Sequence, residues 1–330
     1  MILETLLIPL LSLTWPQNPL LVSVSPFLIT SRLPSLRTAM QPSQPLPVPL
    51  FLLQVYGSMY HINHGNPFNM EVLVESWPEY HTVIVRPQKQ GLRHQEAVVR
   101  AQEMTDNKDP YTNTYCIFSK EPKKLMGVLK NPEIINWKQM FQIQGCQESL
   151  GEGITAVAFS KSVKVNYLNL LLYVTDDILK PSTSNRSKPD SRCETEHPDD
   201  QSQSEDPNFK FSQLHISHAG LVNDNWHAGR NERSLHYIQR CIQTLPAYSL
   251  QGPEGDPVTW VVMDSTCEVG KAYTLERYRS QGKLRQLMVY YLKYLRQKNI
   301  PFYLSVLKEN EKSSRSVLRS GFFVVPCGWH

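Results

Sequence analysis

The sequence predicts an α/β (α+β) chain with two folded domains behind a proline-rich amino-terminal segment. Short runs with the period-two pattern of strands occur between longer runs with helical spacing, a polar segment divides them, and prolines crowd the start of the chain. A length of 330 residues with 41% hydrophobic side chains is compatible with two hydrophobic cores.

Residues 1–54 are apolar, but proline at their density breaks any membrane-spanning helix. A secretory signal places positive charge ahead of its apolar core, whereas here Glu4 precedes the first basic residue, Arg32. We therefore expect this segment to be largely disordered, without stable membrane insertion. Its prolines are Pro9, Pro16, Pro19, Pro26, Pro34, Pro42, Pro45, Pro47 and Pro49.

The first folded domain is placed at residues 55–180. Within it, residues 70–74 (MEVLV) and 81–87 (HTVIVRP) alternate like strands, and the apolar run at 168–174 (LNLLLYV) is typical of a buried strand. Residues 122–144 have mixed helical spacing. This part of the sequence thus predicts several strands and a helical segment.

Residues 181–208 are almost entirely polar, charged or proline. Such a segment buries too little apolar surface to offset the entropy lost on ordering it. We predict that it is a linker and that the domain boundary lies there.

The second domain is placed at residues 209–330. Residues 209–217 alternate like a strand, and residues 232–246 have helical spacing. Two further strand-like runs, 258–264 (VTWVVMD) and 268–275 (EVGKAYTL), flank a short turn. Because this is the pattern of a β-hairpin, we expect these runs to pair.

Charge and metal-binding residues exclude several classes of protein. The 34 basic and 30 acidic residues are interspersed, so no basic stripe indicates a nucleic-acid surface, and the balance fits a small polyanionic ligand. The 6 cysteines form no CxxC pair and the 10 histidines no HxxxH pair. We therefore expect free thiols, a reducing compartment, no metal and no nucleic-acid partner.

The most informative stretch covers residues 276–299, where a glycine-containing turn leads into a helix with one apolar face. The first N–H groups of a helix lack partners, and the helix dipole favours negative charge there. Gly282 would let a phosphate approach the backbone, and Arg279 and Lys283 could add charged contacts. The stretch suits a pyrophosphate, but taken alone it is a weak signal, and an ordinary turn with a solvated basic face is its simpler interpretation.

A strand at residues 299–307, a short helix opening at KENEKS and the tripeptide GFF follow in order. This succession resembles the GNAT acyltransferase superfamily, whose RxxGxG/A loop binds the pyrophosphate of coenzyme A. Arg279 and Gly282 match that loop, although Leu284 stands at its third small position. Val317 stands where many members place a tyrosine that protonates the leaving thiolate.

A closer resemblance is to the glycine N-acyltransferase-like family. The matching strings are YHINHGNPFNMEVLVESWPEY, RPQKQ, LVNDNW, NERSLHYIQRCIQ, GPEGDPVTWVVMD, QKNIPFY and CGWH, and strings this long are very specific. They cover residues 56–330 except an insertion at 91–102. The segment 1–54 and the insertion are foreign to the family pattern, which also usually continues past His330, so we expect a less stable fold than in relatives.

This resemblance implies two GNAT-like domains with mixed, mostly antiparallel sheets flanked by helices. It implies transfer of an acyl group from acyl-CoA to the amino nitrogen of glycine or glutamine. Acyl-CoA would be a co-substrate, with no permanently bound cofactor and no metal. A monomer is expected, in mitochondria or, alternatively, in the cytoplasm or endoplasmic reticulum.

The resemblance also implies roles for single residues. An ammonium nitrogen has no lone pair with which to attack a thioester, so the site needs a base, and Glu268 matches the carboxylate that the family is thought to use. Its simpler interpretation is an exposed turn carboxylate. Main-chain N–H groups at Tyr273, Thr274 and Leu275 would hold the thioester oxygen as charge develops on it.

Three polar residues complete the candidate site. Asn310 would contact the pantetheine arm or, equally, cap a helix. Asn231 and Arg233 would hold the carboxylate of the acceptor, although Arg233 is as well suited to pair with a surface acid. Two other functions stay open, namely acetylation of a protein or amine, and an inactive variant that only binds acyl-CoA.

Overall fold

The computed structural model describes residues 28–30, 53–74, 81–88, 106–145, 148–176 and 208–325. The insertion predicted at 91–102 and the linker predicted at 181–208, apart from Asn208, lie outside these ranges. Within the segment 1–54, only strand β1 (Leu28–Thr30) and the first two residues of helix α2 (Leu53–Asn63) are described.

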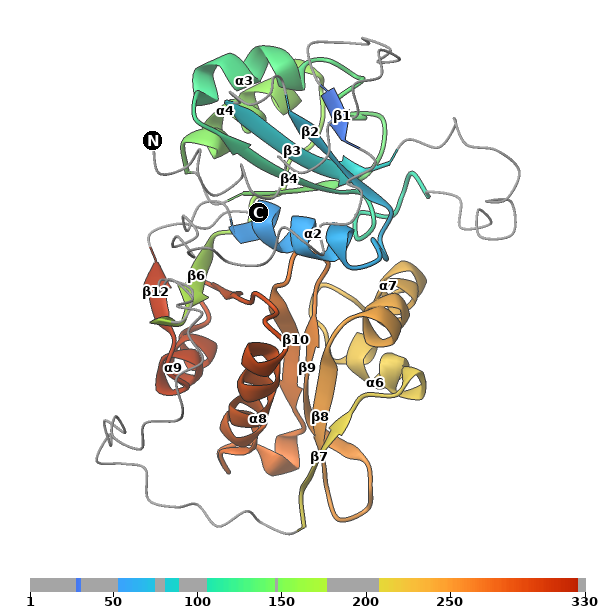
Figure 1. Cartoon of the computed structure of the whole chain (residues 1–330), viewed down its shortest axis with the longest axis vertical. Coiled ribbons are helices and arrows are strands. Elements are labelled where there is room, and N and C mark those ends of the chain that lie inside the picture. The colour runs from blue at the N-terminus through green and yellow to red at the C-terminus, as the bar shows by residue number, and fades with distance from the viewer. Residues whose placement is uncertain are drawn as a thin grey trace, which may run out of the picture.

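The amino-terminal half is built on a five-stranded sheet with helices on both faces (Figure 1). Its strands pair in the order β1-β2-β3-β4-β5, all antiparallel except the parallel pair β4 and β5. After β1 and α2, the elements are β2 (Met70–Val74), β3 (Thr82–Pro87), β4 (Thr114–Ser119), α3 (Pro122–Leu129), β5 (Gln142–Gln144) and α4 (Glu148–Ser160).

Both faces of this sheet are covered, which explains why its central strands are apolar almost throughout. Val72 of β2 belongs to the same buried cluster as Met59 of α2. The next residue, Leu73, belongs to the cluster that includes Leu125 of α3. Successive side chains of a strand point to opposite faces, so α2 covers one face and α3 with α4 the other.

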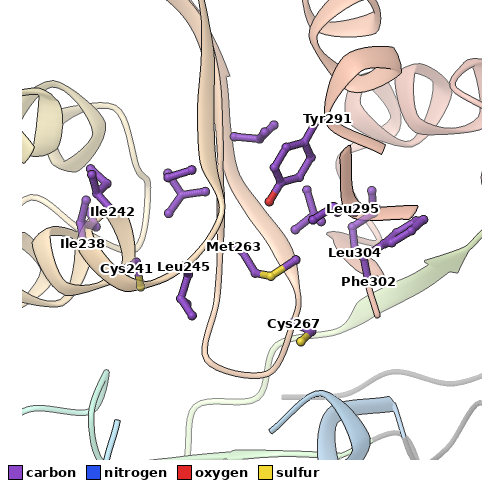
Figure 2. Packing of buried hydrophobic residues seen from close by; sticks show 14 of the residues in the cluster. Ile238, Cys241, Ile242, Leu245, Met263, Cys267, Tyr291, Leu295, Phe302 and Leu304 are labelled. Carbon is purple, nitrogen blue, oxygen red and sulfur yellow. The ribbon is translucent and has the colours of Figure 1, made fainter. Parts of the chain in front are cut away.

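The carboxy-terminal half contains a four-stranded antiparallel sheet in the order β10-β9-β8-β7. Its elements are β7 (Lys210–Gln213), α6 (Ala219–Asp224), α7 (Glu232–Thr244), β8 (Ala247–Gln251), β9 (Pro257–Met263), β10 (Val269–Thr274) and α8 (Lys283–Gln297). Ile238 and Ile242 of α7 approach the β9–β10 hairpin from one side, and Tyr291 and Leu295 of α8 from the other (Figure 2). This sheet is therefore sandwiched between helices.

A three-stranded sheet joins segments from both halves of the sequence. Its order is β11-β6-β12, with both pairs antiparallel. The strands are β6 (Leu170–Val174), β11 (Leu304–Leu307) and β12 (Phe323–Val325), and α9 (Glu311–Arg319) connects the last two. A boundary at 181–208 separates β6 from its two partners in sequence, although hydrogen bonds join them. The division into two sequence domains stays a prediction.

Strands β10 and β11 touch only where β10 begins. The Val269 N–H donates to the Tyr303 carbonyl at 2.7 Å, and Glu268 and Tyr303 form an isolated parallel bridge. Beyond this point the two strands belong to different sheets. The far part of β10 is therefore a sheet edge without a neighbouring strand among the described residues.

Helix α2 packs against the hairpin of the other half as well as against its own sheet (Figure 1). A methyl group built on Gly57 would lie 1.8 Å from the Thr266 carbonyl oxygen, so only a glycine fits at this contact. The two halves thus meet through the backbone of the β9–β10 turn.

The predicted fold class, with mostly antiparallel sheets flanked by helices, is confirmed. The predicted hairpin is the pair β9 and β10, and the helix predicted after Gly282 is α8. Residues 209–217 form only a short strand, β7, before the chain turns into a 3₁₀ helix at Ile216–His218. None of the helices in the described ranges is both long and apolar enough to cross a membrane.

Candidate active site

Glu268 lies at the end of the β9–β10 turn, where the hairpin meets β11. The turn at residues 264–267 is closed by a hydrogen bond from the Cys267 N–H to the Asp264 carbonyl at 3.0 Å. The Ser305 hydroxyl of β11 donates to the Glu268 carboxylate. The carboxylate is thus held at the point from which β10 and β11 diverge, and it is not the freely exposed turn carboxylate of the simpler interpretation.

The surroundings of Glu268 raise the pKa of its carboxyl group. Burial raises its pKa from the ordinary 4.5 to about 7. Hydrogen bonding to Ser305 lowers the pKa, the charge of Asp264 raises it, and the charge of Lys271 lowers it, each by less than burial raises it. A carboxylate with a pKa near neutrality can both accept a proton and release it at physiological pH.

A buried ion pair adjoins Glu268 on the same hairpin. The Lys271 Nζ lies 2.8 Å from Asp264 Oδ2, and only 2% of the Lys271 side chain is exposed. Tyr237 donates its hydroxyl proton to Asp264. Burial alone would raise the pKa of Asp264, but the Lys271 charge and the hydrogen bonds hold it below its ordinary range. Asp264 is therefore a fixed anion, distinct from the titratable Glu268.

Lys271 owes its position to an irregularity in β10. The pairing with β9 shifts register between Gly270 and Tyr273, and Lys271 has a positive φ of 50°. Its ammonium lies 4.8 Å from the ring centre of Trp226 and 5.2 Å from that of Tyr237. A bulge of this kind re-aims a side chain, and here it turns a lysine toward α6 and α7.

The main-chain N–H groups at the end of β10 divide into two kinds. Leu275 donates to the Val258 carbonyl at 2.9 Å, so its N–H is already used within the hairpin. Tyr273 pairs with Trp260 and lies two residues before Leu275, so its N–H also points toward β9. Because inward and outward N–H groups alternate along an antiparallel strand, Thr274 presents its N–H to the open edge of β10.

Helix α8 begins at Gly282 without a side-chain cap. Gly282 has a φ of 70°, which favours glycine, and a Cβ built there would meet no atom within 4 Å. The Gln286 N–H donates to the Gly282 carbonyl as the first turn of the helix. The main-chain N–H groups of Leu284 and Arg285 precede that bond, so they point out of the helix end toward open space.

Arg279 connects this helix end with the edge of β10. Its guanidinium donates to the Tyr273 hydroxyl at 2.7 Å and to the Thr274 carbonyl at 3.1 Å, and it lies over the Tyr273 ring at 5.0 Å. The sequence predicts that Lys283 adds a charged contact to a pyrophosphate, but here Lys283 is buried with its ammonium 3.3 Å from the Phe209 ring centre. Lys283 therefore packs against Phe209, the residue before β7.

Asn310, Asn231 and Arg233 take structural partners. Asn310 caps α9 through a hydrogen bond from the Ser313 N–H at 3.1 Å. Asn231 caps α7 and donates to the Tyr111 hydroxyl at 3.0 Å. The Arg233 guanidinium pairs with the Asp106 carboxylate. The last two residues therefore tie the halves together, and Arg233 takes the surface acid that its alternative interpretation required.

Sequence reasoning missed Ser305, Asp264 and Lys271. Lys271 carried a signal, because a lysine inside an apolar strand, three residues after a candidate base, is unusual. Ser305 carried none, since nothing local to β11 indicates that its hydroxyl meets Glu268. Within the described ranges, no group of three or more histidine, cysteine, aspartate or glutamate side chains could hold a metal ion.

The perturbed pKa of Glu268 predicts a pH-dependent stability difference between wild type and Glu268→Gln. The folded state binds the proton more tightly than the unfolded chain, so wild-type stability is lost as pH rises from 4.5 through about 7. Above pH 7 the variant is expected to be more stable, by up to about 3 kcal/mol. Below pH 4.5 the stability advantage of the variant vanishes. Urea unfolding of both proteins below pH 4.5 and above pH 7 measures this difference.

The lowered pKa of His61 changes stability with pH in the opposite direction. Both proteins contain His61, so its contribution cancels in the difference between them. Burial lowers the pKa of His61 to about 4 from the ordinary 6.5, so stability falls as pH drops through that window in both proteins. A constant difference between Glu268→Gln and wild type at all pH values would contradict the raised pKa.

Two family models match the chain. The model for aralkyl acyl-CoA:amino acid N-acyltransferase matches residues 46–246, and the model for the carboxy-terminal region of the same family matches residues 248–330.

Individual proteins show the same likeness. The chain is similar to human glycine N-acyltransferase-like protein 1, with 63% identity over 278 residues that cover 84% of this chain and 88% of that protein. Human glycine N-acyltransferase is 40% identical over 278 residues, which cover 84% and 89%. An X-ray structure of a Drosophila protein aligns with a TM-score of 0.60 at 12% identity, covering 84% of this chain and 87% of that one, which bears on the fold alone.

Proposed function

Because this chain belongs to the aralkyl acyl-CoA:amino acid N-acyltransferase family, we propose that it transfers an acyl group to the amino nitrogen of glycine or glutamine, with Glu268 as the general base. Acyl-CoA is the co-substrate of this family's reaction. The observation that carries the proposal is the Glu268 carboxylate, held by Ser305 at the point from which β10 and β11 diverge, where burial raises its pKa to about 7.

The start of α8 is the proposed site for the diphosphate of coenzyme A. Outward-pointing N–H groups, the positive end of the helix dipole and the open space at Gly282 suit a phosphate group. Arg279 stands between this helix end and β10. It is 48% exposed on its side chain, so its guanidinium can reach an anion while still stacked on Tyr273.

The open edge of β10 is the proposed track for the pantetheine arm and the thioester. An extended amide-bearing chain can add to a sheet edge through main-chain hydrogen bonds. Thr274 offers an N–H to that edge, whereas Leu275 does not in this structure. We therefore keep Thr274, and not Leu275, as a main-chain donor to the ligand.

The chemistry follows from the position of Glu268. The carboxylate takes a proton from the acceptor ammonium, and the freed nitrogen pair attacks the thioester carbon. A C–N bond forms and the C–S bond breaks, the nitrogen loses its second proton to solvent as it becomes an amide, and the coenzyme A thiolate leaves and takes up a proton. Glu268 carries the proton removed in the first step, so the same carboxyl can return it to the thiolate. Val317, at the position of the usual tyrosine, cannot.

An assay of thiol release tests the proposed function. Purified protein is incubated with benzoyl-, phenylacetyl- or oleoyl-CoA and with glycine or glutamine. Release that depends on the amino acid supports the proposal and distinguishes the two acceptors. Release only with a lysine peptide would indicate protein acetylation, and stabilisation by acyl-CoA without release would indicate an inactive binder. Fractionation of cells expressing the chain tests the mitochondrial location that we propose.

The substitution Gly282→Ala is expected to weaken acyl-CoA binding about tenfold, because its methyl group would occupy the space proposed for the phosphate. Gly321→Ala is a matched control, since Gly321 also has a positive φ, 84°, and open space around its Cβ position. Both variants incur backbone strain. Isothermal calorimetry should show weaker coenzyme A binding for Gly282→Ala than for Gly321→Ala. Equal affinities would contradict the diphosphate site proposed at the start of α8.

A further inference from the structure

The turn that precedes Glu268 is in contact with a helix from the other end of the chain. Gly57 of α2 lies against this turn so closely that an added Cβ would be 1.8 Å from the Thr266 carbonyl oxygen and 2.9 Å from the Cys267 Cβ. Cys267 itself has a positive φ of 63°, which is uncommon for a residue with a side chain. Such a conformation persists only when its surroundings hold it.

His61, one helical turn after Gly57, contacts the last residue of the same turn. Its Nε2 lies 3.1 Å from the Cys267 Sγ, and the same thiol contacts the Gly57 carbonyl oxygen at 3.5 Å. Only 7% of His61 is exposed. Helix α2 therefore restrains Thr266 and Cys267, the last two residues of the turn, through Gly57 and His61.

The position of Glu268 depends on this turn. Glu268 directly follows Cys267, and the next residue, Val269, is tied by its N–H to Tyr303, the residue before β11. A shift of the turn away from α2 would carry the Glu268 carboxylate away from Ser305 and toward solvent. A displacement of about 1 Å at a reacting group can lower the rate about 10²-fold.

We propose that Gly57 and His61 are positioning residues that hold the β9–β10 turn, so that the amino-terminal half of the chain sets the location and solvation of the base. This role rests on the proposed function of Glu268. It differs from a merely structural contact, which would affect stability but leave the titration of Glu268 and the turnover of the folded protein unchanged.

The test uses the full chain and three variants. His61→Phe keeps a ring but removes the hydrogen bond to Cys267, His61→Gln retains an amide that can replace it, and Gly57→Ala adds the clashing methyl group. Gly127→Ala is the matched control for Gly57→Ala, because Gly127 lies in α3 with no atom within 4 Å of its Cβ position.

Three readouts are measured on each folded variant. Carbon-13 NMR of labelled glutamate follows the Glu268 carboxyl through a pH titration, with Glu268→Gln assigning the signal. Steady-state kinetics gives kcat and KM, and calorimetry gives the affinity for coenzyme A. The titration reads Glu268 whether or not the protein acylates amino acids, so its result is independent of the proposed function.

In His61→Phe and Gly57→Ala, we expect the pKa of Glu268 to fall by about one unit, kcat to fall about 10²-fold, and coenzyme A affinity to stay unchanged. His61→Gln should restore most of both values, and Gly127→Ala should match wild type. If Gly57→Ala does not fold, His61→Phe alone decides. An unchanged Glu268 titration and unchanged kcat in folded His61→Phe would overturn the proposal.

Discussion

Replacing Glu268 with glutamine is expected to lower kcat by about 10²–10⁴ while leaving the affinity for coenzyme A unchanged. Glutamine occupies nearly the same volume and can still contact Ser305, but it cannot accept the proton of the acceptor ammonium. The proposed diphosphate site at Gly282 lies on another element, α8, so calorimetry should give the wild-type dissociation constant.

The pH profile provides a sharper readout of the same variant. In wild type, kcat/KM should rise as pH increases through about 7, where Glu268 loses its proton. The residual activity of Glu268→Gln should lack this rise. Glu254→Gln is a suitable control, because Glu254 is an exposed carboxylate of the turn before β9. A variant that keeps wild-type turnover would exclude Glu268 as the base.

The substitution Lys271→Met is expected to lower the free energy of unfolding by about 3–5 kcal/mol, because it leaves the Asp264 carboxylate buried without its counter-ion. Methionine retains the apolar part of the side chain against Trp226 and Tyr237. The double variant Lys271→Met with Asp264→Asn should recover much of the loss, since no unpaired charge remains. Urea unfolding of the four proteins in this cycle measures the coupling.

An exposed ion pair provides the control for this cycle. Arg315 and Glu311 are paired on α9 at 3.8 Å, with 65% and 83% of their side chains exposed. Breaking that pair by Arg315→Met should leave stability almost unchanged, because water screens it. If Lys271→Met were as mild as Arg315→Met, the buried pair would not stabilise the hairpin.

The parts of the fold that depend on local periodicity could be predicted from sequence. The apolar face of α8 and the turn between β9 and β10 are each determined by residues close together in the sequence. Both elements occur at the predicted places. The pairing of β6 with β11 could not be predicted in this way. A continuous apolar run identifies β6 as a buried strand but carries no information about which distant strand pairs with it.

The candidate site shows the same division. Gly282 could be predicted from a loop motif and Glu268 from the family resemblance, whereas Ser305 and the Asp264–Lys271 pair depend on how the chain packs in three dimensions. Asn231 and Asn310 show a different difficulty, because the same side chain suits a ligand contact and a helix cap. In this structure the caps account for both asparagines.

The central place of β6 between β11 and β12 has a consequence for biosynthesis. Tyr173 pairs with Leu304 and Val324, so this strand leaves the ribosome long before either partner is translated. Until then its two hydrogen-bonding edges are open to wrong partners. Contacts this distant in sequence form slowly, so a nascent chain is most vulnerable to aggregation during this interval. A chaperone that shields one short apolar strand would have its greatest effect then.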